Sequence, residues 1–413
     1  MVKVSLTFGA WYGDEKIELD FPENWIFSLH RLRKASDIGE IGVSDGLSNP
    51  IGSKPLYKLA DGRKNAVILV DDLTRPTPAH RILPHIVREL ERGGIGENRI
   101  KIVMAIAAHR PLTPTDLGKK LGKEILNSLE VVNHNPYENL VYLGESLRGT
   151  PIYLNGDVYE ADLKIGVGSV IPHPSAGFGG GGKIILPGVV GMETIEHNHY
   201  SLLSQGRHGF LEGSILRVDA EDVARRVGLE AVVNVVINEG RGIAGLFFGD
   251  PIDAHRAAVS YGRSIYGIPS IKNEKADVLI TNAYPIDTEL IQAGKALWAQ
   301  DYLMKKGGTI VLLSACSEGM GHHYLIERRR AKERAKGETG AMEKEGETTE
   351  KKAIWSNLIV FSPNLTKRMV QKIFPGAELI GNWKEVLEEV ERRHGKAIRA
   401  QILTCGSIQC PLG

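Results

Sequence analysis

The chain has 413 residues, of which 42% are hydrophobic, and a formal charge of +1. It is too long for a single hydrophobic core, so we expect two domains, and its near-neutral charge excludes a global field that recruits nucleic acid or anionic membrane. No apolar run reaches the ~20 residues of a membrane span, and the N-terminal segment lacks the apolar stretch of a signal peptide, so we expect a cytoplasmic protein without membrane or nucleic-acid partners.

The first half of the chain alternates strand and helix patterns. Residues 1–21 alternate apolar and polar residues like two strands around "YGDE". "AVILV" (66–70) is a continuous apolar run, which is typical of a buried parallel strand. A helix is expected from about Pro78 to Gly93, because apolar residues recur there at helical spacing: Ile82, Leu83, Ile86, Val87 and Leu90.

Two further buried strands each lead to a histidine. "RIKIVMAIAAH" ends at His109, and "ADLKIGVGSVIPH" ends near His173. Strands that alternate with helices indicate an α/β fold. Polar residues at the carboxyl ends of parallel strands are where ligands usually bind. The two histidines are therefore candidate site residues.

A second α/β block begins near Lys275. Its expected strands are "ADVLITNAYP", "TIVLLSAC", "NLIVFSP", "AELIG" and "AIRAQIL", with helices between them. We predict two α/β domains, residues 1–270 and 271–413, the second Rossmann-like, with a cofactor and substrate cleft between them. The charged stretch 327–352 is interpreted as a solvated helix that continues into a mobile loop, in preference to a charged binding patch. Three cysteines are too few for a disulfide framework and are expected to be reduced: Cys316, Cys405 and Cys410.

Four consecutive glycines, Gly179 to Gly182, run directly into Lys183. The pattern approaches a phosphate loop, but Ile184 stands where that motif needs a hydroxyl, and Pro187 falls inside the helix that should follow. A flexible linker would carry polar flanks, whereas these flanks are apolar. A buried glycine loop that brings the backbone close to a ligand is favoured over both alternatives.

Several titratable residues surround this loop in the sequence. His109 and His173 can each accept a proton near neutral pH, and a racemase needs two bases on opposite sides of one carbon. His197 and His199, in "EHNH", share a face on a strand but point apart on a helix, and imidazole is a nickel ligand. Two histidines alone are a weak signal for a metal site.

Other polar residues suggest a small anionic substrate. Asp72 and Arg75, in "DDLTRPTP", directly follow a predicted strand, and Arg75 and Arg110 offer forked donors for a carboxylate. Gln292 and Lys295 lie three apart on a predicted helix, where Lys295 faces either solvent or the cleft. Trp355 is more often a core residue than a ligand contact.

At this point several separate stretches coincide with one family. "DDLTRPTP", "AAHRPLT", "HPSAGFGGGGKIILPG", "EHNH" and "ELIQAGK" resemble the lactate racemase family, whose members use a nickel-pincer nucleotide. The resemblance runs from about residue 70 to 300. It implies a pyridinium mononucleotide with two sulfur-containing groups that hold nickel, and dedicated maturation enzymes that make it.

The resemblance also implies a role for each candidate residue. Lys183 would form a thioamide link to the cofactor and His199 would bind nickel. His109 and His173 would be the paired bases. Arg75 and Lys295 would hold the substrate. Further contacts to the cofactor would come from Asp72, Ser175, Gly179, Gly180, Gly181, Gly182, Gln292, Lys295 and Trp355.

The implied reaction inverts the hydroxyl-bearing C2 of a 2-hydroxy acid, which is lactate or a larger hydroxy or sugar acid. One histidine takes the hydroxyl proton while hydride moves to the cofactor and later returns to the other face. The alternatives are a phosphate-loop-like nucleotide-binding protein and a family member that binds the cofactor without catalysis. Both His109 and His173 are present, which argues against the latter.

Overall fold

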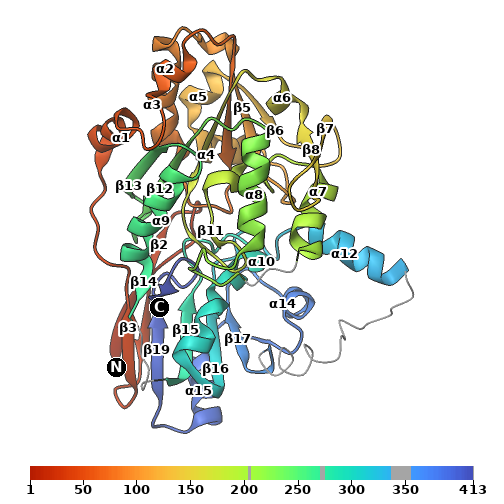
Figure 1. Cartoon of the computed structure of the whole chain (residues 1–413). Coiled ribbons are helices and arrows are strands. Elements are labelled where there is room, and N and C mark those ends of the chain that lie inside the picture. Colours follow the sequence, from red (N-terminus) through yellow and green to blue (C-terminus); the bar gives the residue numbers. More distant parts are fainter. Residues whose placement is uncertain (203–205, 270–274, 336–354, 413) are drawn as a thin grey trace. The chain divides into compact units, whose positions relative to one another are not determined.

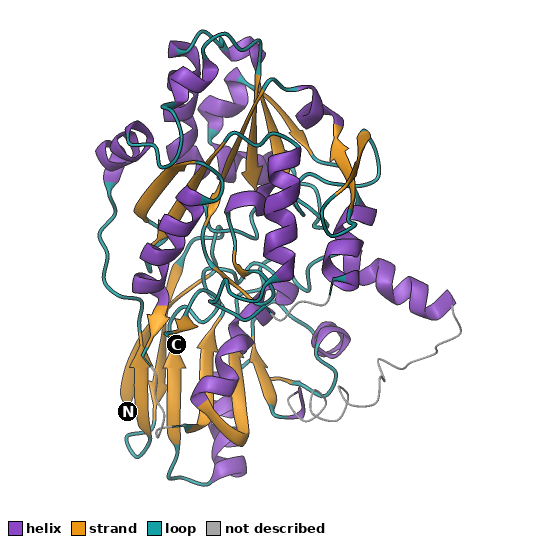
Figure 2. Cartoon of the chain, viewed as in Figure 1, coloured by secondary structure: helices purple, strands orange, loops and turns teal. Residues whose placement is uncertain are grey.

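The computed structural model describes residues 1–202, 206–269, 275–335 and 355–412, which form two compact units (Figure 1). One unit comprises Lys34–Ile265, and the other comprises Met1–Arg33 together with Tyr266–Gly413. Each unit contains a six-stranded sheet, and helices accompany the strands in both (Figure 2). The predicted α/β class with two units is confirmed.

The sheet of the Lys34–Ile265 unit has the order β13-β12-β9-β4-β5-β6, and only β13 is antiparallel to its neighbour. Its strands are β4 (Ala66–Asp71), β5 (Ile100–Ala105), β6 (Glu130–Asn133), β9 (Leu163–Ser169), β12 (Ala231–Ile237) and β13 (Ile243–Gly249). Every residue of β4, β9 and β12 is buried, which explains their continuous apolar sequences. The smaller strands are β7 (Leu140–Glu145), β8 (Pro151–Asn155), β10 (Pro172–His173) and β11 (Gly177–Phe178).

Helices and turns connect these strands. They are α1 (Gly39–Ser48), α2 (Leu56–Ala60), α3 (Ala79–Arg92), η1 (Glu97–Arg99), α4 (Pro114–Leu121), α5 (Lys123–Ser128), α6 (Gly156–Glu160), η2 (Gly181–Ile184), α7 (Met192–Glu196), η3 (His197–Ser201), α8 (Ile215–Arg226) and α9 (Asp253–Tyr266). The helix predicted from Pro78 is α3, which buries the five apolar residues that predicted it.

The order of this sheet creates a switch point beside β4. The chain passes from β4 outward to β5 and β6, then returns to β9 on the other side of β4. Ligands of doubly wound proteins bind at the carboxyl ends of the strands where the order reverses. "DDLTRPTP" leaves the end of β4, and the segment that leads into the glycines leaves the end of β9. The topology thus brings both stretches to the same edge of the sheet.

The other unit contains a fully parallel sheet of order β18-β17-β16-β15-β19-β3. Its strands are β3 (Ile26–His30), β15 (Ala276–Asn282), β16 (Met304–Leu313), β17 (Leu358–Phe361), β18 (Glu378–Leu379) and β19 (Arg399–Leu403). Two short pairs accompany it, β1 (Val2–Phe8) with β2 (Glu15–Phe21) and β14 (Gly267–Ile268) with β20 (Cys410–Pro411). Its helices are α10 (Leu290–Ala293), η4 (Gly294–Ala299), α11 (Gln300–Leu303), α12 (Tyr324–Ala335), α14 (Lys367–Ile373) and α15 (Trp383–His394).

The N-terminal 33 residues differ from the predicted division at residue 270. They join the C-terminal unit because β3 pairs with β19, and because Asn282 Nδ2 donates to Thr7 O over 2.8 Å. The Trp383 indole also donates to Asp20 O over 2.9 Å. A sequence pattern shows that a strand exists but not which sheet it enters. The prediction placed these residues in the first domain because they precede it in the chain, whereas they belong to the C-terminal unit.

Three smaller expectations concern the surface and the thiols. The start of the charged stretch is helical in α12, and residues 336–352 lie outside the described residues. All three cysteines are buried and free, as expected of reduced thiols. Among the described helices, none is both long enough and apolar enough to cross a membrane.

Candidate functional site

The loop after β4 carries Asp72, Thr74 and Arg75. Asp72 is buried; its Oδ1 accepts from the Thr74 amide over 2.8 Å and from the Thr74 hydroxyl over 2.5 Å. Arg75 Nη1 donates to the same hydroxyl over 2.8 Å. These local bonds replace the regular backbone bonds that end with the strand, so the loop holds a carboxylate and a guanidinium in fixed positions.

His109 contacts this loop, although it lies 37 residues after Asp72 in the chain. Strand β5 ends at Ala105, and His109 follows a tight turn in which Ala107 has a φ of 53°. Its Nδ1 lies 2.6 Å from Asp72 Oδ2. Because an ionised carboxylate only accepts, Nδ1 carries the proton and Nε2 keeps its lone pair for chemistry.

Asp72 stays ionised in this arrangement. Burial alone would raise its pKa, but the charge and hydrogen bond of His109, with the charge of Arg75, hold the pKa below its ordinary value. A buried anion with a fixed partner orients an imidazole and stabilises its protonated form. His109 is therefore arranged as a base, and Asp72 is the carboxylate that orients it.

A buried lysine supports the same loop from beneath. Lys120, on α4, donates to Asp72 O over 2.9 Å and to Arg75 O over 3.0 Å, and it lies 2.7 Å from Asp71 Oδ1. Helix α4 begins at a capping box between Thr113 and Asp116, which fixes its start. The sequence analysis missed Lys120, although Leu121 beside it is also buried and a charge among the buried positions of an amphipathic helix is a signal.

Arg110 does not share the predicted role of a substrate fork. Its Nη1 donates to Asp116 Oδ2 over 2.8 Å and to Pro111 O over 3.0 Å. The guanidinium thus completes the N-terminus of α4. Of the two arginines that the sequence suggested, Arg75 is the one placed beside the histidine and the acid.

The glycine run is tightly packed. Gly180 and Gly181 have φ angles of 72° and 59°, which side chains rarely adopt. A Cβ on Gly180 would lie 2.7 Å from Asn234 Oδ1, and one on Gly182 would lie 2.9 Å from Ala220 O. We expected these glycines to clear space for a cofactor. At these positions protein lies where a Cβ would be, so packing and backbone conformation require the glycines, and contact between their backbone and a cofactor remains a prediction.

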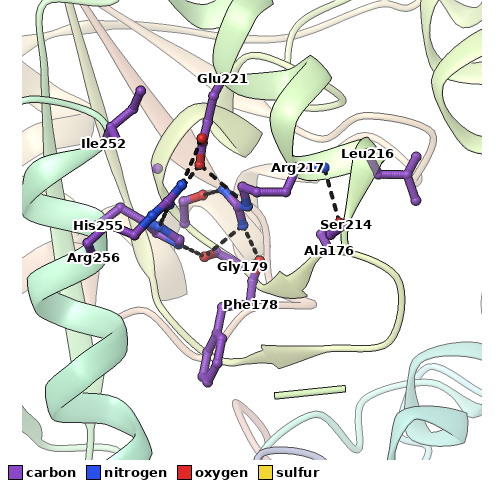
Figure 3. A network of polar contacts seen from close by, with 12 residues as sticks. Ala176, Phe178, Gly179, Ser214, Leu216, Arg217, Glu221, Ile252, His255 and Arg256 are labelled. Atoms are coloured by element: carbon purple, nitrogen blue, oxygen red, sulfur yellow. Dashed lines mark hydrogen bonds and ion pairs between the residues drawn. The ribbon is translucent and has the colours of Figure 1, made fainter. Parts of the chain in front are cut away.

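A polar network holds this loop in place (Figure 3). Arg217 of α8 and His255 of α9 donate to the loop's carbonyl oxygens, and Asn234 of β12 accepts from the Gly181 amide over 3.0 Å. None of the three was singled out by sequence. Arg217 lies next to the buried Leu216 and three residues before the buried Ala220, which was the available signal.

Lys183 ends the loop within η2 and is partly buried. Burial, and then the charges of Arg217 and Arg75, lower the pKa of its amine to about 7. Within the described part of the chain, Lys183 forms no ion pair with a carboxylate. A large fraction of the amine is therefore neutral and nucleophilic near pH 7. The turn continues into Pro187 without an α-helix after the lysine, which argues against a phosphate loop.

His199 lies in η3, a helical turn that follows α7, so His197 and His199 point apart. His199 Nδ1 lies 3.1 Å from Ile195 O, which can only accept, so Nδ1 carries the proton and Nε2 can bind a metal. Burial and the charge of Lys183 lower its pKa to about 3, which keeps the ring neutral. His197 Nδ1 instead contacts Thr150 Oγ1 over 2.8 Å.

His173 stands at the start of the same loop. It pairs with Gly177 across the β10–β11 hairpin, and its Nδ1 accepts from the Ser175 and Ala176 amides over 3.3 and 3.1 Å. Ser175 O in turn accepts from Ser214 Oγ over 2.7 Å. The ring is thus held by its Nδ1 edge. That His173 faces the same carbon as His109 remains a prediction.

Three predicted residues lie in the other unit. Gln292 is buried in α10, and Lys295 falls in the following turn η4, so the expected single helix is broken between them. Trp355 packs on Phe374 with ring centroids 4.6 Å apart, beside a core cluster of that unit. Their roles at the cofactor or substrate remain predictions.

Electrostatics link the groups of the Lys34–Ile265 unit. The charge of Arg75 acts on both Asp72 and Lys183, and His199 is affected by both Lys183 and His109. Four groups therefore interact electrostatically: the His109 base, the Arg75 guanidinium, the Lys183 amine and the His199 imidazole. Among the described residues there is no cluster of three or more His, Cys, Asp or Glu that could hold a metal.

Comparisons with known proteins identify the family of the chain. A family model described as lactate racemase N-terminal domain matches residues 12–209, and one described as lactate racemase C-terminal domain matches residues 271–370. The chain is 35% identical over 294 residues to a lactate racemase of Lactiplantibacillus plantarum, covering 69% of each protein. It is 32% identical over 321 residues to one of Thermoanaerobacterium thermosaccharolyticum, covering 75% of this chain and 74% of the relative.

Solved structures show the same architecture. The lactate racemase apoprotein of Thermoanaerobacterium thermosaccharolyticum superposes with a TM-score of 0.79 at 25% identity, over 100% of both chains. A Thermotoga maritima protein superposes with a TM-score of 0.67 at 16% identity, over 91% of this chain and 99% of that one. The second match shows the fold alone.

Proposed function

Because the chain belongs to the lactate racemase family, as its motifs predicted, we propose that it racemises or epimerises a 2-hydroxy acid at C2. The observation that supports this most strongly is that Arg75 and His109 follow two paired strands at one edge of a sheet and interact electrostatically with Lys183 and His199. A carboxylate fork, a proton acceptor and a site for a metal-bearing group are the parts that such a reaction requires.

The residues fit a nickel-pincer nucleotide. Lys183 offers an amine that is partly neutral near pH 7 for a covalent link, and His199 offers one imidazole nitrogen to nickel, with the cofactor's sulfur groups as the other donors. Contacts from Asp72, Ser175 and Gly179–Gly182, and from Gln292, Lys295 and Trp355, belong to the same proposal. When bound, this cofactor supplies a reversible hydride acceptor.

The chain's own residues handle the proton and the carboxylate. His109 Nε2 accepts the proton of the substrate hydroxyl, because Asp72 holds its Nδ1 proton and stabilises the imidazolium that forms. The neutral His173 ring accepts the Ser175 and Ala176 amides at Nδ1; in its protonated, imidazolium form it returns a proton to the oxygen and becomes neutral again. Arg75 pairs with the substrate carboxylate, with Lys295 as a second substrate contact.

The test uses full-length protein co-produced with cofactor maturation enzymes. Intact mass and nickel analysis establish loading, and enantiopure lactate and larger 2-hydroxy acids are then followed by chiral chromatography. We expect one nickel per chain and interconversion of at least one acid. Loaded protein that interconverts none of them would favour the non-catalytic alternative, and magnesium-dependent ATP binding without nickel would favour a nucleotide-binding protein.

Two substitutions test the assignment of the bases. His109→Gln and His173→Gln should each lower kcat by about 100-fold or more while the cofactor mass is retained. His85→Gln is the matched control, because His85 pairs with Glu40 outside the site. Full activity in both site variants would show that the bases are wrongly assigned.

A further inference from the structure

Consecutive carbonyl groups of the glycine loop turn toward side chains from other elements. Arg217 Nη1 donates to Gly180 O over 2.9 Å, and its Nη2 contacts Phe178 O and, over 3.4 Å, Gly179 O. His255 Nε2 lies 2.8 Å from Gly179 O (Figure 3). Two side chains thus account for all three carbonyls that immediately precede η2.

Arg217 is a buried cation whose donors are directed mainly at backbone. Its side chain is 1% exposed, and the carboxylate oxygen of Glu221 lies 3.9 Å from Nε. Burial lowers its pKa to about 10, so it stays charged at neutral pH. A planar guanidinium presents several donors in a fixed fork, whereas an ammonium is a compact charge at the end of a flexible stem. Its position therefore fixes the path of the loop.

His255 is held in one tautomer. Arg256 forms a fork with Glu221 over 2.8 Å at both oxygens, and its Nη1 also donates to His255 Nδ1 over 2.9 Å. A guanidinium only donates, so Nδ1 must accept and Nε2 must carry the proton that goes to Gly179 O. Burial holds the pKa of His255 well below its usual value, so the ring stays neutral.

We propose that Arg217 and His255 are positioning residues that set the glycine loop and thereby direct Lys183 toward the cofactor. The proposal rests on the proposed function for the identity of the group that Lys183 meets. Gly181 follows the last of the bound carbonyls, and Lys183 lies two residues further, within the same turn. Loss of a carbonyl anchor therefore moves the lysine, whereas the sheet beneath the loop keeps its own bonds.

The primary test compares His255→Gln with His255→Leu. Glutamine places an amide N–H near the position of Nε2 and keeps the bond to Gly179 O, whereas leucine fills similar space without a donor. Each protein is co-produced with the maturation enzymes, and the modified fraction of Lys183 is measured by peptide mass. We expect about a tenfold loss in His255→Leu, the effect of one buried hydrogen bond, and recovery to near wild type in His255→Gln.

The control is Arg226→Met. Arg226 lies on the same helix α8, but its guanidinium pairs with Asp222 at the surface. It should load like wild type, and thermal melting of each variant separates loading from folding. Arg217→Lys provides a second series: it keeps the charge but loses the fixed fork of donors that reaches three carbonyls, so loading should fall.

Hydrogen exchange of apo protein distinguishes the inference from the proposed function. Amides 179–183 should exchange about tenfold faster in His255→Leu than in wild type or His255→Gln. If wild type never loads, the proposed function fails, while the exchange result still decides the positioning role. Equal loading and equal exchange in all three proteins, or equal losses in Gln and Leu, would overturn the inference.

Discussion

Two loops at one edge of the same sheet are each held by a single buried cation, but the two cations differ in their charge balance. Lys120 supports the Asp72–Arg75 loop through two carbonyls and lies 2.7 Å from Asp71. Arg217 supports the glycine loop through three carbonyls, with its closest carboxylate contact at 3.9 Å. The positive charge of Lys120 thus has a carboxylate in close contact, whereas that of Arg217 has one only at a longer distance.

This difference separates a stabilising role from an electrostatic one. Lys120 and Asp71 form a close buried ion pair, so removal of Lys120 would leave the charge of Asp71 buried without its cation. Burial, and then the charge of Arg217, lower the pKa of Lys183. The Asp72–Arg75 loop thus fixes an acid–base pair, whereas the cation that supports the glycine loop also lowers the pKa of the Lys183 amine.

Lys120→Met should produce the largest effect on stability. It leaves Asp71 buried without its cation, so we expect the free energy of unfolding to fall by about 3–5 kcal/mol. Urea denaturation measures this loss. The double variant Lys120→Met with Asp71→Asn removes the orphaned charge and should recover part of it. A Lys120→Met variant as stable as wild type would show that the Lys120–Asp71 ion pair does not stabilise the fold.

Arg217→Met should cost less, roughly 2–3 kcal/mol, because carbonyls rather than a close carboxylate lose their partner. Glu221 keeps its fork with Arg256. The same urea series ranks the two variants. A larger loss for Arg217→Met than for Lys120→Met would reverse the comparison between the loops.

Gly180→Ala tests whether the glycine loop is packed by protein. Gly180 and Gly62 have φ angles of 72° and 76°, but only Gly180 has neighbours within 4 Å of an added Cβ. Gly62→Ala should cost about 1 kcal/mol for backbone strain alone, and Gly180→Ala about 1–3 kcal/mol more for overpacking. Equal losses in thermal melting would show that the loop has room.

The smallest expected effect is a shift in the reactivity of Lys183. An amine is nucleophilic only when it is deprotonated, so acetylation of Lys183 in apo protein should rise with a midpoint near pH 7, where its pKa lies. Exposed lysines should follow only near their usual pKa of about 10.4. Arg217→Met removes a positive charge and should raise the midpoint. A Lys183 that titrates with the exposed lysines would contradict its burial.

The sequence predicts more of the fold than of the support beneath the site. Continuous apolar runs identified β4, β5 and β9, and the family motifs identified Asp72, His109, Lys183 and His199. The sequence could not show that Lys120 and Arg217 lie beneath these loops, because each is one charge on an amphipathic helix. It also assigned residues 1–33 to the wrong unit and did not show that protein packs closely against the glycines, since pairing partners and packing neighbours are set by tertiary contacts.

The account depends most on Lys183 as the point of cofactor attachment. Peptide fragmentation of protein co-produced with the maturation enzymes locates the added mass directly. We predict that the mass lies on Lys183 and that Lys183→Ala carries none. Protein that holds one nickel per chain and racemises its substrate while Lys183 stays unmodified would contradict the account.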